Sequence, residues 1–211
     1  FPNTNSGYGT RSNGICTENQ KLKPISHYGI TKCDSEDLLL KNGNAIIFRF
    51  ATVFGVSPRM RLDLLVNEFV YKALTDKYIT IFERKAVRNY IHIRDVADVF
   101  NFMIDNKDEY KGEIFNVGLS DANINKQELA ELIKKYISDF AITYSDYYED
   151  PDKRDYIVSN EKIENTGWTP KYNLDDGIKE LIMAYQIIIN NDTSHFRNGF
   201  PLTYGAALWE Y

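Results

Sequence analysis

The side chains of Tyr28 and Lys32 have types and a spacing that suit proton chemistry. They lie four residues apart, so on a helix they share one face and lie one turn from each other. A phenol has a pKa of about 10, and a neighbouring ammonium group lowers that value because the positive charge favours the phenolate. The pair is therefore suited to general acid–base catalysis on a hydroxyl group. The same spacing also fits an ordinary exposed pair on a helix surface.

A helix must carry this pair, and the local pattern predicts one from about Ser26 to Asn42. Pro24 precedes it, the Ser26 hydroxyl can cap its start and Gly43 can end it. The mostly apolar run 45–51 then predicts a buried strand. Apolar spacing and capping residues predict further helices over 62–74, 95–104, 125–136, 161–166 and 174–189. Short apolar runs predict strands over 78–82, 89–93, 114–117 and 141–144.

The composition argues against several classes of protein. The chain has 211 residues, 43% of them apolar, which suffices for a packed core. The net charge is −5 and no basic run stands out, so we expect no nucleic-acid partner. No apolar run approaches the roughly 20 residues needed to cross a bilayer, so we expect no membrane partner. Cys16 and Cys33 form no metal-type cluster and no disulfide framework, which predicts no metal site and two reduced thiols in a cytoplasmic protein.

A second tyrosine gives the pair a recognisable context. Tyr8 stands twenty residues before Tyr28, in the run 2–9. This arrangement resembles the extended short-chain dehydrogenase/reductase family, which includes NAD-dependent nucleotide-sugar epimerases, dehydratases and dehydrogenases. The resemblance implies that Tyr28 is the acid/base while hydride moves to or from NAD, and that Lys32 tunes Tyr28 and holds the cofactor ribose. It implies that the Thr4 hydroxyl holds the reacting sugar oxygen; simple loop capping is the alternative role for Thr4.

The two residues after Thr4 distinguish between reactions within this family. The resemblance places Asn5 and Ser6 beside the substrate, where the 4,6-dehydratases carry an acid pair that eliminates water. Neither an amide nor a serine hydroxyl is an ordinary general acid or base. We therefore expect oxidation, reduction or epimerisation instead of dehydration.

Later runs resemble the family in the same order. The run 49–55 is similar to the strand and turn after the catalytic helix, which implies that Thr52 and Val53 line the nicotinamide and the substrate. In the run 57–67, Asn67 matches an asparagine that contacts the substrate diphosphate. The alternative for Asn67 is a polar position on a helix surface.

Two arginines complete the expected substrate site. The run 88–97 resembles a family signature in which Arg88 binds the nucleotide diphosphate, which suits the planar guanidinium. Arg154 matches another substrate-binding arginine, with a surface ion pair as the alternative. We interpret His92 as a buried, hydrogen-bonded histidine, not a catalyst, and Asp95 as a helix cap.

The resemblance covers about residues 1–189 and implies an α/β fold, namely the C-terminal part of a Rossmann-type doubly wound parallel sheet plus a small mixed α/β substrate-binding domain. It assigns 1–57 and 86–117 to the Rossmann half, 58–85 and 118–190 to the substrate-binding domain, and 191–211 to a tail. The family's glycine-rich turn for the dinucleotide pyrophosphate has no counterpart here, since Gly7, Gly9 and Gly14 have the wrong spacing. We therefore expect a sequence without its N-terminal part, and no activity from this part alone.

The runs 2–9, 57–61 and 153–156 look closest to 4-dehydrogenases of GDP-linked manno-heptose. This implies NAD-dependent oxidation at C4 of a nucleotide-linked sugar, in polysaccharide biosynthesis. A nucleotide-sugar 4-epimerase is one alternative, and a non-catalytic binding or scaffold relative of the fold is another. The family also implies a homodimer of the full-length protein, because the helix that carries Tyr28 usually joins a four-helix interface.

Overall fold

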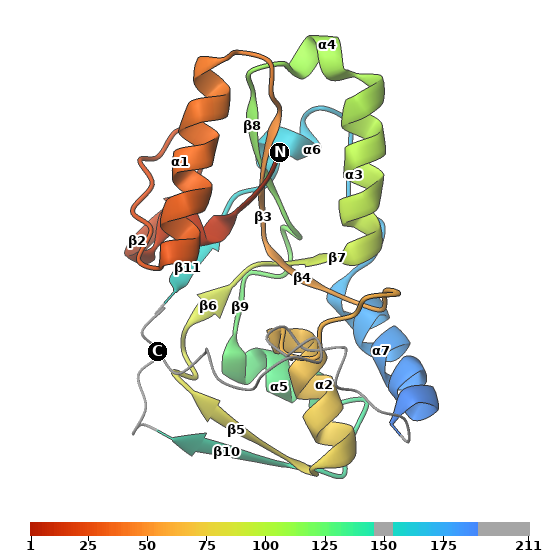
Figure 1. The fold of residues 1–211 in the computed structure, drawn as a ribbon. Helices are drawn as coiled ribbons and strands as arrows, with labels where there is room; N and C mark the ends of the chain where they lie inside the picture. Colours follow the sequence, from red (N-terminus) through yellow and green to blue (C-terminus); the bar gives the residue numbers. More distant parts are fainter. Residues whose placement is uncertain (146–153, 190–211) are drawn as a thin grey trace, which may run out of the picture.

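The computed structural model of this chain describes residues 1–145 and 154–189, an α/β arrangement in which helices flank parallel strands (Figure 1). The first elements are β1 (Pro2–Thr4), the 3-10 helix η1 (Asn5–Tyr8), β2 (Thr10–Cys16), α1 (His27–Lys41), β3 (Ile47–Phe50), β4 (Thr52–Phe54), α2 (Leu65–Thr75), β5 (Tyr78–Phe82), β6 (Val87–Arg88) and β7 (Tyr90–His92). They are followed by α3 (Ile93–Asp105), α4 (Lys107–Tyr110), β8 (Ile114–Val117), β9 (Ile124–Asn125), α5 (Lys126–Lys134), β10 (Ala141–Ser145), β11 (Asp155–Val158), α6 (Glu161–Glu164) and α7 (Leu174–Ile188).

The central sheet has three parallel strands in the order β1-β3-β8. Its register pairs Thr4 with Phe50 and Phe50 with Val117, so the three strands end at the same edge. α1 and α3 flank this sheet (Figure 1). In open parallel sheets the carboxyl ends of the strands are where ligands bind, and this edge is where Thr4 lies.

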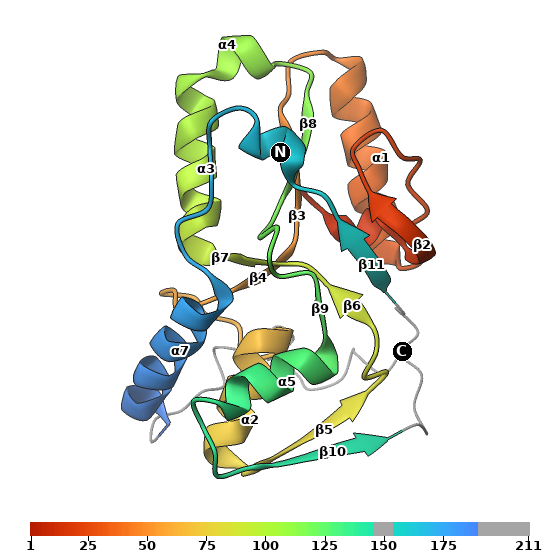
Figure 2. The ribbon, with the colours of Figure 1, turned by 180° about the vertical axis from the view of Figure 1, so that it is seen from behind.

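Smaller sheets lie at the other end of the molecule and along its side. β5 and β10 pair in parallel near α2 and α5, in the lower half of Figure 1. β4 continues beyond β3 and pairs in parallel with β7, whereas β6 and β9 pair antiparallel. Seen from behind in Figure 2, β11 lies beside β2 on the side of α1. This pairing brings the chain after residue 154 back to the segment that follows Thr4.

One hydrophobic cluster runs through both ends of the structure. It contains Phe48 and Phe115 of the central sheet together with Val70 of α2, Leu129 of α5 and Leu181 of α7, all buried. Burying a side chain of this size contributes roughly 1.5–3 kcal/mol. The helices α2, α5 and α7 and the central sheet therefore share a continuous core.

Most elements predicted from the sequence are confirmed, with boundaries that move by a few residues. Ser26 caps α1 as expected, because its hydroxyl accepts the Gly29 N–H at 3.2 Å. Asn125 caps α5 in a reciprocal arrangement with Glu128. α5 ends at Lys134 and α6 at Glu164, each two residues before the predicted end. The strands β2, β4, β6, β9 and β11 and the short helix α4 were not predicted, since none of them has a long apolar run.

The start of α2 was predicted wrongly. The expected helix over 62–74 begins at Leu65, with Leu64 as its cap residue. Leu62 fits the apolar spacing of a helix, yet it lies in the preceding turn and is only 2% exposed. Leu62 is apolar because it packs into the core, and this burial does not require a helix at that position.

Asp95 is not the cap of α3, which corrects the sequence interpretation. The cap is His92, whose Nδ1 accepts the backbone N–H of Arg94 at 3.2 Å. Asp95 lies in the first turn and is fully buried. Its carboxylate accepts the backbone N–H groups of Lys171 and Tyr172 at 2.9 and 3.1 Å, so it holds the segment that leads into α7.

The division of the chain into two interleaved domains stays a prediction, and the expected tail at 191–211 lies outside the described residues. Among residues 1–145 and 154–189, no helix combines the length and apolar character that a membrane span requires.

Candidate active site

A cavity of about 740 Å³ opens at the carboxyl ends of β1 and β3. Seven of the residues predicted for the site line it: Thr4, Ser6, Tyr28, Lys32, Thr52, Val53 and Arg154. Three cationic side chains, those of Lys32, Arg61 and Arg154, belong to its described walls, and no carboxylate does. Such a wall favours a negatively charged ligand.

Tyr28 and Lys32 reach the cavity from the first turns of α1. The Tyr28 side chain is 54% exposed, so its hydroxyl is accessible to a ligand. The Lys32 ammonium group donates to the Pro2 carbonyl at 2.8 Å and lies 5.9 Å from the centre of the Tyr28 ring. The ammonium group therefore lies beside the phenol ring, and its hydrogen bond to the first residue of β1 holds it there.

Buried polar contacts hold α1 against that sheet. Arg49 of β3 forms an ion pair with Glu36 of α1 at 2.5 Å, and both side chains are nearly inaccessible. Asn3 of β1 also donates to Glu36, and Arg49 donates to the Tyr8 hydroxyl at 3.0 Å. Burial raises the pKa of Tyr8 to about 12, so this tyrosine is a neutral structural group at physiological pH. No local pattern of the sequence indicates these contacts, because they join residues of α1, β1, β3 and η1 that lie far apart along the chain.

Thr4, Ser6 and Arg154 form a hydrogen-bonded chain on another wall of the cavity. The Thr4 hydroxyl donates to Ser6 Oγ at 3.0 Å and accepts the Ser6 backbone N–H at 3.1 Å. Arg154 Nη1 donates to the same Ser6 Oγ at 2.6 Å. Thr4 is also the N-cap of η1, so the loop-capping role and the cavity position belong to the same side chain. We refer to Thr4, Ser6, Tyr28, Lys32 and Arg154 as the cavity cluster.

Three predicted site residues do not line the cavity. Asn5 is 1% exposed, and neither end of its amide has a hydrogen-bond partner in the described structure. Asn67 is buried in α2 and uses its amide to accept the Gly55 N–H and to donate to the Arg61 carbonyl. Arg88 is buried too, and its guanidinium lies 5.8 Å from the centre of the Tyr156 ring.

The cavity residues that the prediction missed include Arg61 and Tyr156. Arg61 lies within the run 57–67, in which only Asn67 was expected at the site. The Arg61 guanidinium donates two hydrogen bonds to the Asp63 carboxylate, at 3.0 and 2.6 Å. Tyr156 follows Arg154 by two residues, at the start of β11. Residues two apart on a strand point to the same side, so an extended reading of 154–158 would have placed Tyr156 on the cavity wall.

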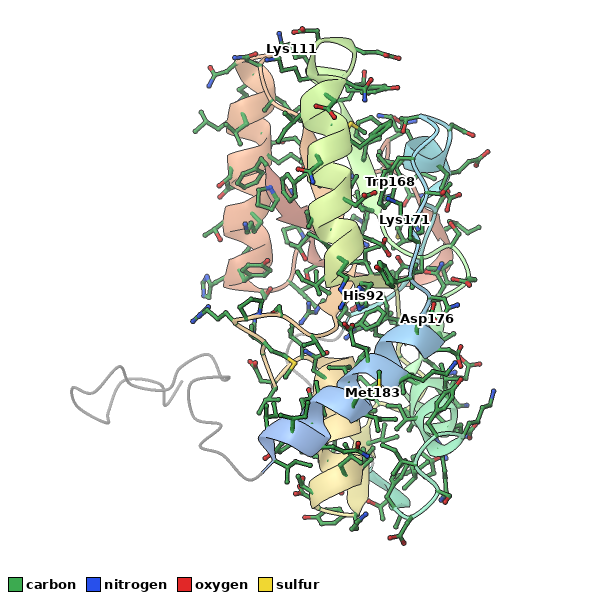
Figure 3. All side chains as sticks on the ribbon, turned by 90° about the vertical axis from the view of Figure 1, so that its right-hand side faces the viewer. His92, Lys111, Trp168, Lys171, Asp176 and Met183 are labelled. Atoms are coloured by element: carbon green, nitrogen blue, oxygen red, sulfur yellow. The ribbon has the colours of Figure 1, made fainter. Side chains whose placement is uncertain are left out.

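A second polar group lies where α3 meets α7 (Figure 3). Its members are His92, Arg94, Asp95, Asp98 and Glu180, which we refer to as the junction cluster. The His92 ring is fully buried, donates from Nε2 to Glu180 at 2.8 Å and stacks on Tyr172 with ring centres 4.7 Å apart. His92 is thus a buried, hydrogen-bonded histidine, as predicted.

No group of three or more His, Cys, Asp or Glu side chains is arranged to hold a metal ion in residues 1–145 and 154–189. Two of the glycines near the start of the chain lie close to other protein groups. A Cβ atom at Gly9 would lie 2.1 Å from the Lys23 carbonyl oxygen, and one at Gly7 would lie 3.0 Å from Cys33 Sγ. These two glycines therefore permit close packing within the protein.

The chain is similar in sequence to several known proteins. A sequence model of the family described as "NAD dependent epimerase/dehydratase family" matches residues 1–118. A low-salt glycan biosynthesis protein of Haloferax volcanii is 25% identical over 191 residues, covering 86% of this chain and 59% of the relative. A human dTDP-D-glucose 4,6-dehydratase is 26% identical over 204 residues, covering 90% of this chain and 57% of the relative. The chain thus spans less than two thirds of the length of either relative.

Among solved structures, a UDP-glucose 4-epimerase of Thermotoga maritima with UDP-glucose superposes with a TM-score of 0.76. It is 25% identical, and the match covers 90% of this chain and 63% of that one. The parallel strands with flanking helices thus match a Rossmann-like fold, which confirms the fold class predicted from the sequence.

Proposed function

Because the chain belongs to the NAD-dependent epimerase/dehydratase family, we propose that it carries the reaction site of an enzyme that oxidises C4 of a nucleotide-linked sugar, of the GDP-manno-heptose type. One observation supports this most strongly. Tyr28 and Lys32 of α1 line a single cavity with cationic walls together with Thr4, which stands 24 residues before Tyr28 in the sequence. A diphosphate-linked sugar has the negative charge that such walls favour.

The residues present fit the nicotinamide end of NAD. The Tyr28 hydroxyl is accessible, and the Lys32 ammonium group has further N–H donors beyond the one given to Pro2. Thr52 and Val53 line the same cavity from β4. These four side chains would hold the nicotinamide and its ribose. When bound, oxidised NAD accepts the hydride that leaves C4 of the sugar.

The chain's own side chains would handle the proton and the orientation of the sugar. Tyr28, as phenolate, takes the proton of the C4 hydroxyl while the C4–H bond breaks and the C4–O bond becomes a ketone. Thr4 holds the reacting oxygen beside Tyr28, and Lys32 supplies positive charge near the phenol ring. Arg154 binds the diphosphate, for which a guanidinium is suited.

Dehydration is disfavoured by the residues after Thr4. Ser6 accepts hydrogen bonds from both Thr4 and Arg154, and Asn5 does not line the cavity. Neither side chain is an ordinary general acid or base. The second candidate is 4-epimerisation, which the similarity to the Thermotoga maritima UDP-glucose 4-epimerase favours. It needs the same proton transfer, followed by return of the hydride to the other face of C4.

Product analysis on the complete protein that carries this chain tests the proposal. The protein is incubated with oxidised NAD in three separate reactions, each with one sugar: GDP-manno-heptose, GDP-mannose or UDP-glucose. Oxidation gives one equivalent of reduced cofactor, read by absorbance, for each equivalent of C4 ketone, read by NMR. A C4 epimer without net cofactor reduction would establish the epimerase instead. Neither product from any of these sugars would overturn the proposal.

A further inference from the structure

The Arg154–Ser6–Thr4 chain joins two parts of the cavity that the proposed function uses separately. Arg154 precedes β11, and Thr4 ends β1, 150 residues earlier in the sequence. The Ser6 hydroxyl oxygen is the shared acceptor, at 2.6 Å from Arg154 Nη1 and 3.0 Å from Thr4 Oγ1. The Arg154 guanidinium, which the proposed function assigns to the diphosphate, is therefore connected through one side chain to the Thr4 hydroxyl, which it assigns to the reacting sugar oxygen.

We infer that Arg154 is a positioning residue for Thr4 that acts through Ser6. The inference rests on the proposed function, in which Thr4 holds the reacting oxygen, and it adds a second role for Arg154 beside binding of the diphosphate. Ser6 is the intermediate in this connection. Its hydroxyl oxygen is a partner that Arg154 and Thr4 share.

The burial of Ser6 strengthens the dependence of Thr4 on Arg154. Ser6 is only 2% exposed, so water has little access to replace a lost partner. A hydrogen bond from a charged donor is about twice as strong as one between neutral groups, and the short contact from Arg154 is of this kind. A threonine hydroxyl can occupy more than one rotamer. The Ser6 acceptor selects the rotamer in which the Thr4 hydroxyl donates to Ser6 Oγ.

The pairing also sets which groups remain for a substrate. The Thr4 proton is donated to Ser6, and one Thr4 lone pair accepts the Ser6 backbone N–H. The Thr4 oxygen therefore keeps one lone pair for a substrate hydroxyl in the cavity. Because Arg154 holds the Ser6 oxygen to which Thr4 donates, it also fixes the direction of this acceptor.

Methyl NMR of the complete protein tests this connection without any turnover. Threonine methyl groups are labelled with 13C, and the Thr4→Ser variant assigns the Thr4 signal by its loss. We expect Ser6→Ala and Arg154→Gln each to shift the Thr4 signal by more than its linewidth, with no additional shift from Arg154→Gln in the Ser6→Ala background. Arg61→Gln is the matched control, because Arg61 faces the same cavity but bonds to Asp63. An unmoved Thr4 signal in Arg154→Gln, or shifts that simply add, would overturn the inference.

Kinetics with the sugar that the wild-type protein turns over give the second readout. Ser6→Ala should lower kcat about tenfold, the effect of one hydrogen bond, with KM changed less than about threefold. Arg154→Gln should raise KM and lower kcat, but in the Ser6→Ala background it should raise KM only. Ser6→Thr, which restores a hydroxyl, should recover kcat. If the kcat losses of Ser6→Ala and Arg154→Gln multiplied in the double variant, the coupling would be contradicted, and the proposed function would still stand. If no sugar reacts, the proposed function fails and the NMR result still decides the coupling.

Discussion

The cavity cluster and the junction cluster are both built from charged and polar side chains, yet they differ in what those groups bond to. In the junction cluster, Glu180 takes both His92 and Arg94 as partners, and Asp95 takes two backbone N–H groups. In the cavity cluster, Tyr28 is more than half exposed, and the Lys32 ammonium group has one described acceptor, a backbone carbonyl. One cluster is closed within the protein, and the other faces a cavity of about 740 Å³.

This difference indicates what each cluster is for. A buried polar group without a partner costs free energy, so a cluster whose members satisfy one another contributes to stability and has little left to offer a ligand. A cluster that leaves donors and acceptors facing a cavity retains that capacity for a substrate. Residue types alone do not separate the two, since a histidine beside a glutamate is as familiar in active sites as a tyrosine beside a lysine.

The largest effect that the comparison predicts is on turnover in Tyr28→Phe. Removing the hydroxyl removes the proton acceptor, so kcat for sugar oxidation by the complete protein should fall about 10²- to 10⁴-fold. The side chain is 54% exposed and its ring is retained, so the midpoint temperature of unfolding should not change. Steady-state kinetics and thermal unfolding of the same preparation check both points. Unchanged turnover would remove Tyr28 from the mechanism.

The converse behaviour is expected for His92→Ala in the junction cluster. The variant loses a fully buried ring that stacks on Tyr172 and meets the Phe54 ring edge-on, so the free energy of unfolding should fall by about 3 kcal/mol. The kcat of the folded fraction should stay near that of the wild type. Denaturant unfolding gives the first quantity and kinetics at low temperature the second.

His27→Ala is the control for that experiment. His27 is the first residue of α1 and is exposed, so its loss should change the free energy of unfolding by less than about 0.5 kcal/mol. A stable His92→Ala protein with poor turnover would reverse the assignment of the two clusters.

Gly177→Ala measures how tightly the junction is packed. A Cβ atom at this position of α7 would lie 2.2 Å from the Phe54 ring and 3.0 Å from the His92 ring. Overpacking of this kind costs about 1–3 kcal/mol, partly offset by the better helix propensity of alanine. We expect a net loss of about 1 kcal/mol in the free energy of unfolding.

Gly29→Ala in α1 is the matched substitution near the cavity. Its Cβ atom would lie 3.0 Å from Pro24 Cβ and no closer to any other group, so it should destabilise less than Gly177→Ala. Equal losses of unfolding free energy from the two substitutions would show that the two regions are equally tightly packed.

The sequence predicted the elements better than the contacts. Ser26 two residues after Pro24 and Asn125 three residues before Glu128 are local signals, and both caps form as expected. Leu62 was misassigned because an apolar residue can fit a helix pattern without being helical. Asp95 was misassigned because an acidic residue suits both the cap and the first turn of a helix. Only the tertiary structure shows that Leu62 fills the core and that Asp95 binds the segment 171–172.

The candidate site shows the same limit at longer range. Spacing placed Tyr28 and Lys32 on one helix, and the resemblance to a known family added Thr4 and Arg154. Neither source indicated that Ser6 bonds to Arg154, because that contact spans 148 positions of the sequence. Asn67 and Arg88 were expected at the substrate, but the structure buries both against protein groups. Contacts between distant segments depend on register and packing, which one sequence does not encode in any local pattern.

The smallest predicted effect concerns Asp98 at the solvent-exposed edge of the junction cluster. Its carboxylate accepts hydrogen bonds from Lys171 and from the Trp168 indole, and these hold its pKa below the ordinary value. A carboxyl with a depressed pKa in the folded state stabilises the protein above its unfolded pKa of about 3.9, and that contribution is lost as the pH falls through the folded pKa. Because Asp98 is 36% exposed and Lys171 is 65% exposed, water screens the pair. Asp98→Asn should therefore lower the midpoint temperature of unfolding slightly at pH 7, and the difference from the wild type should shrink below about pH 4. A difference that grew on acidification would mean that the Asp98 carboxyl is protonated more readily in the folded state, and the edge of the junction would then be less closed than its core.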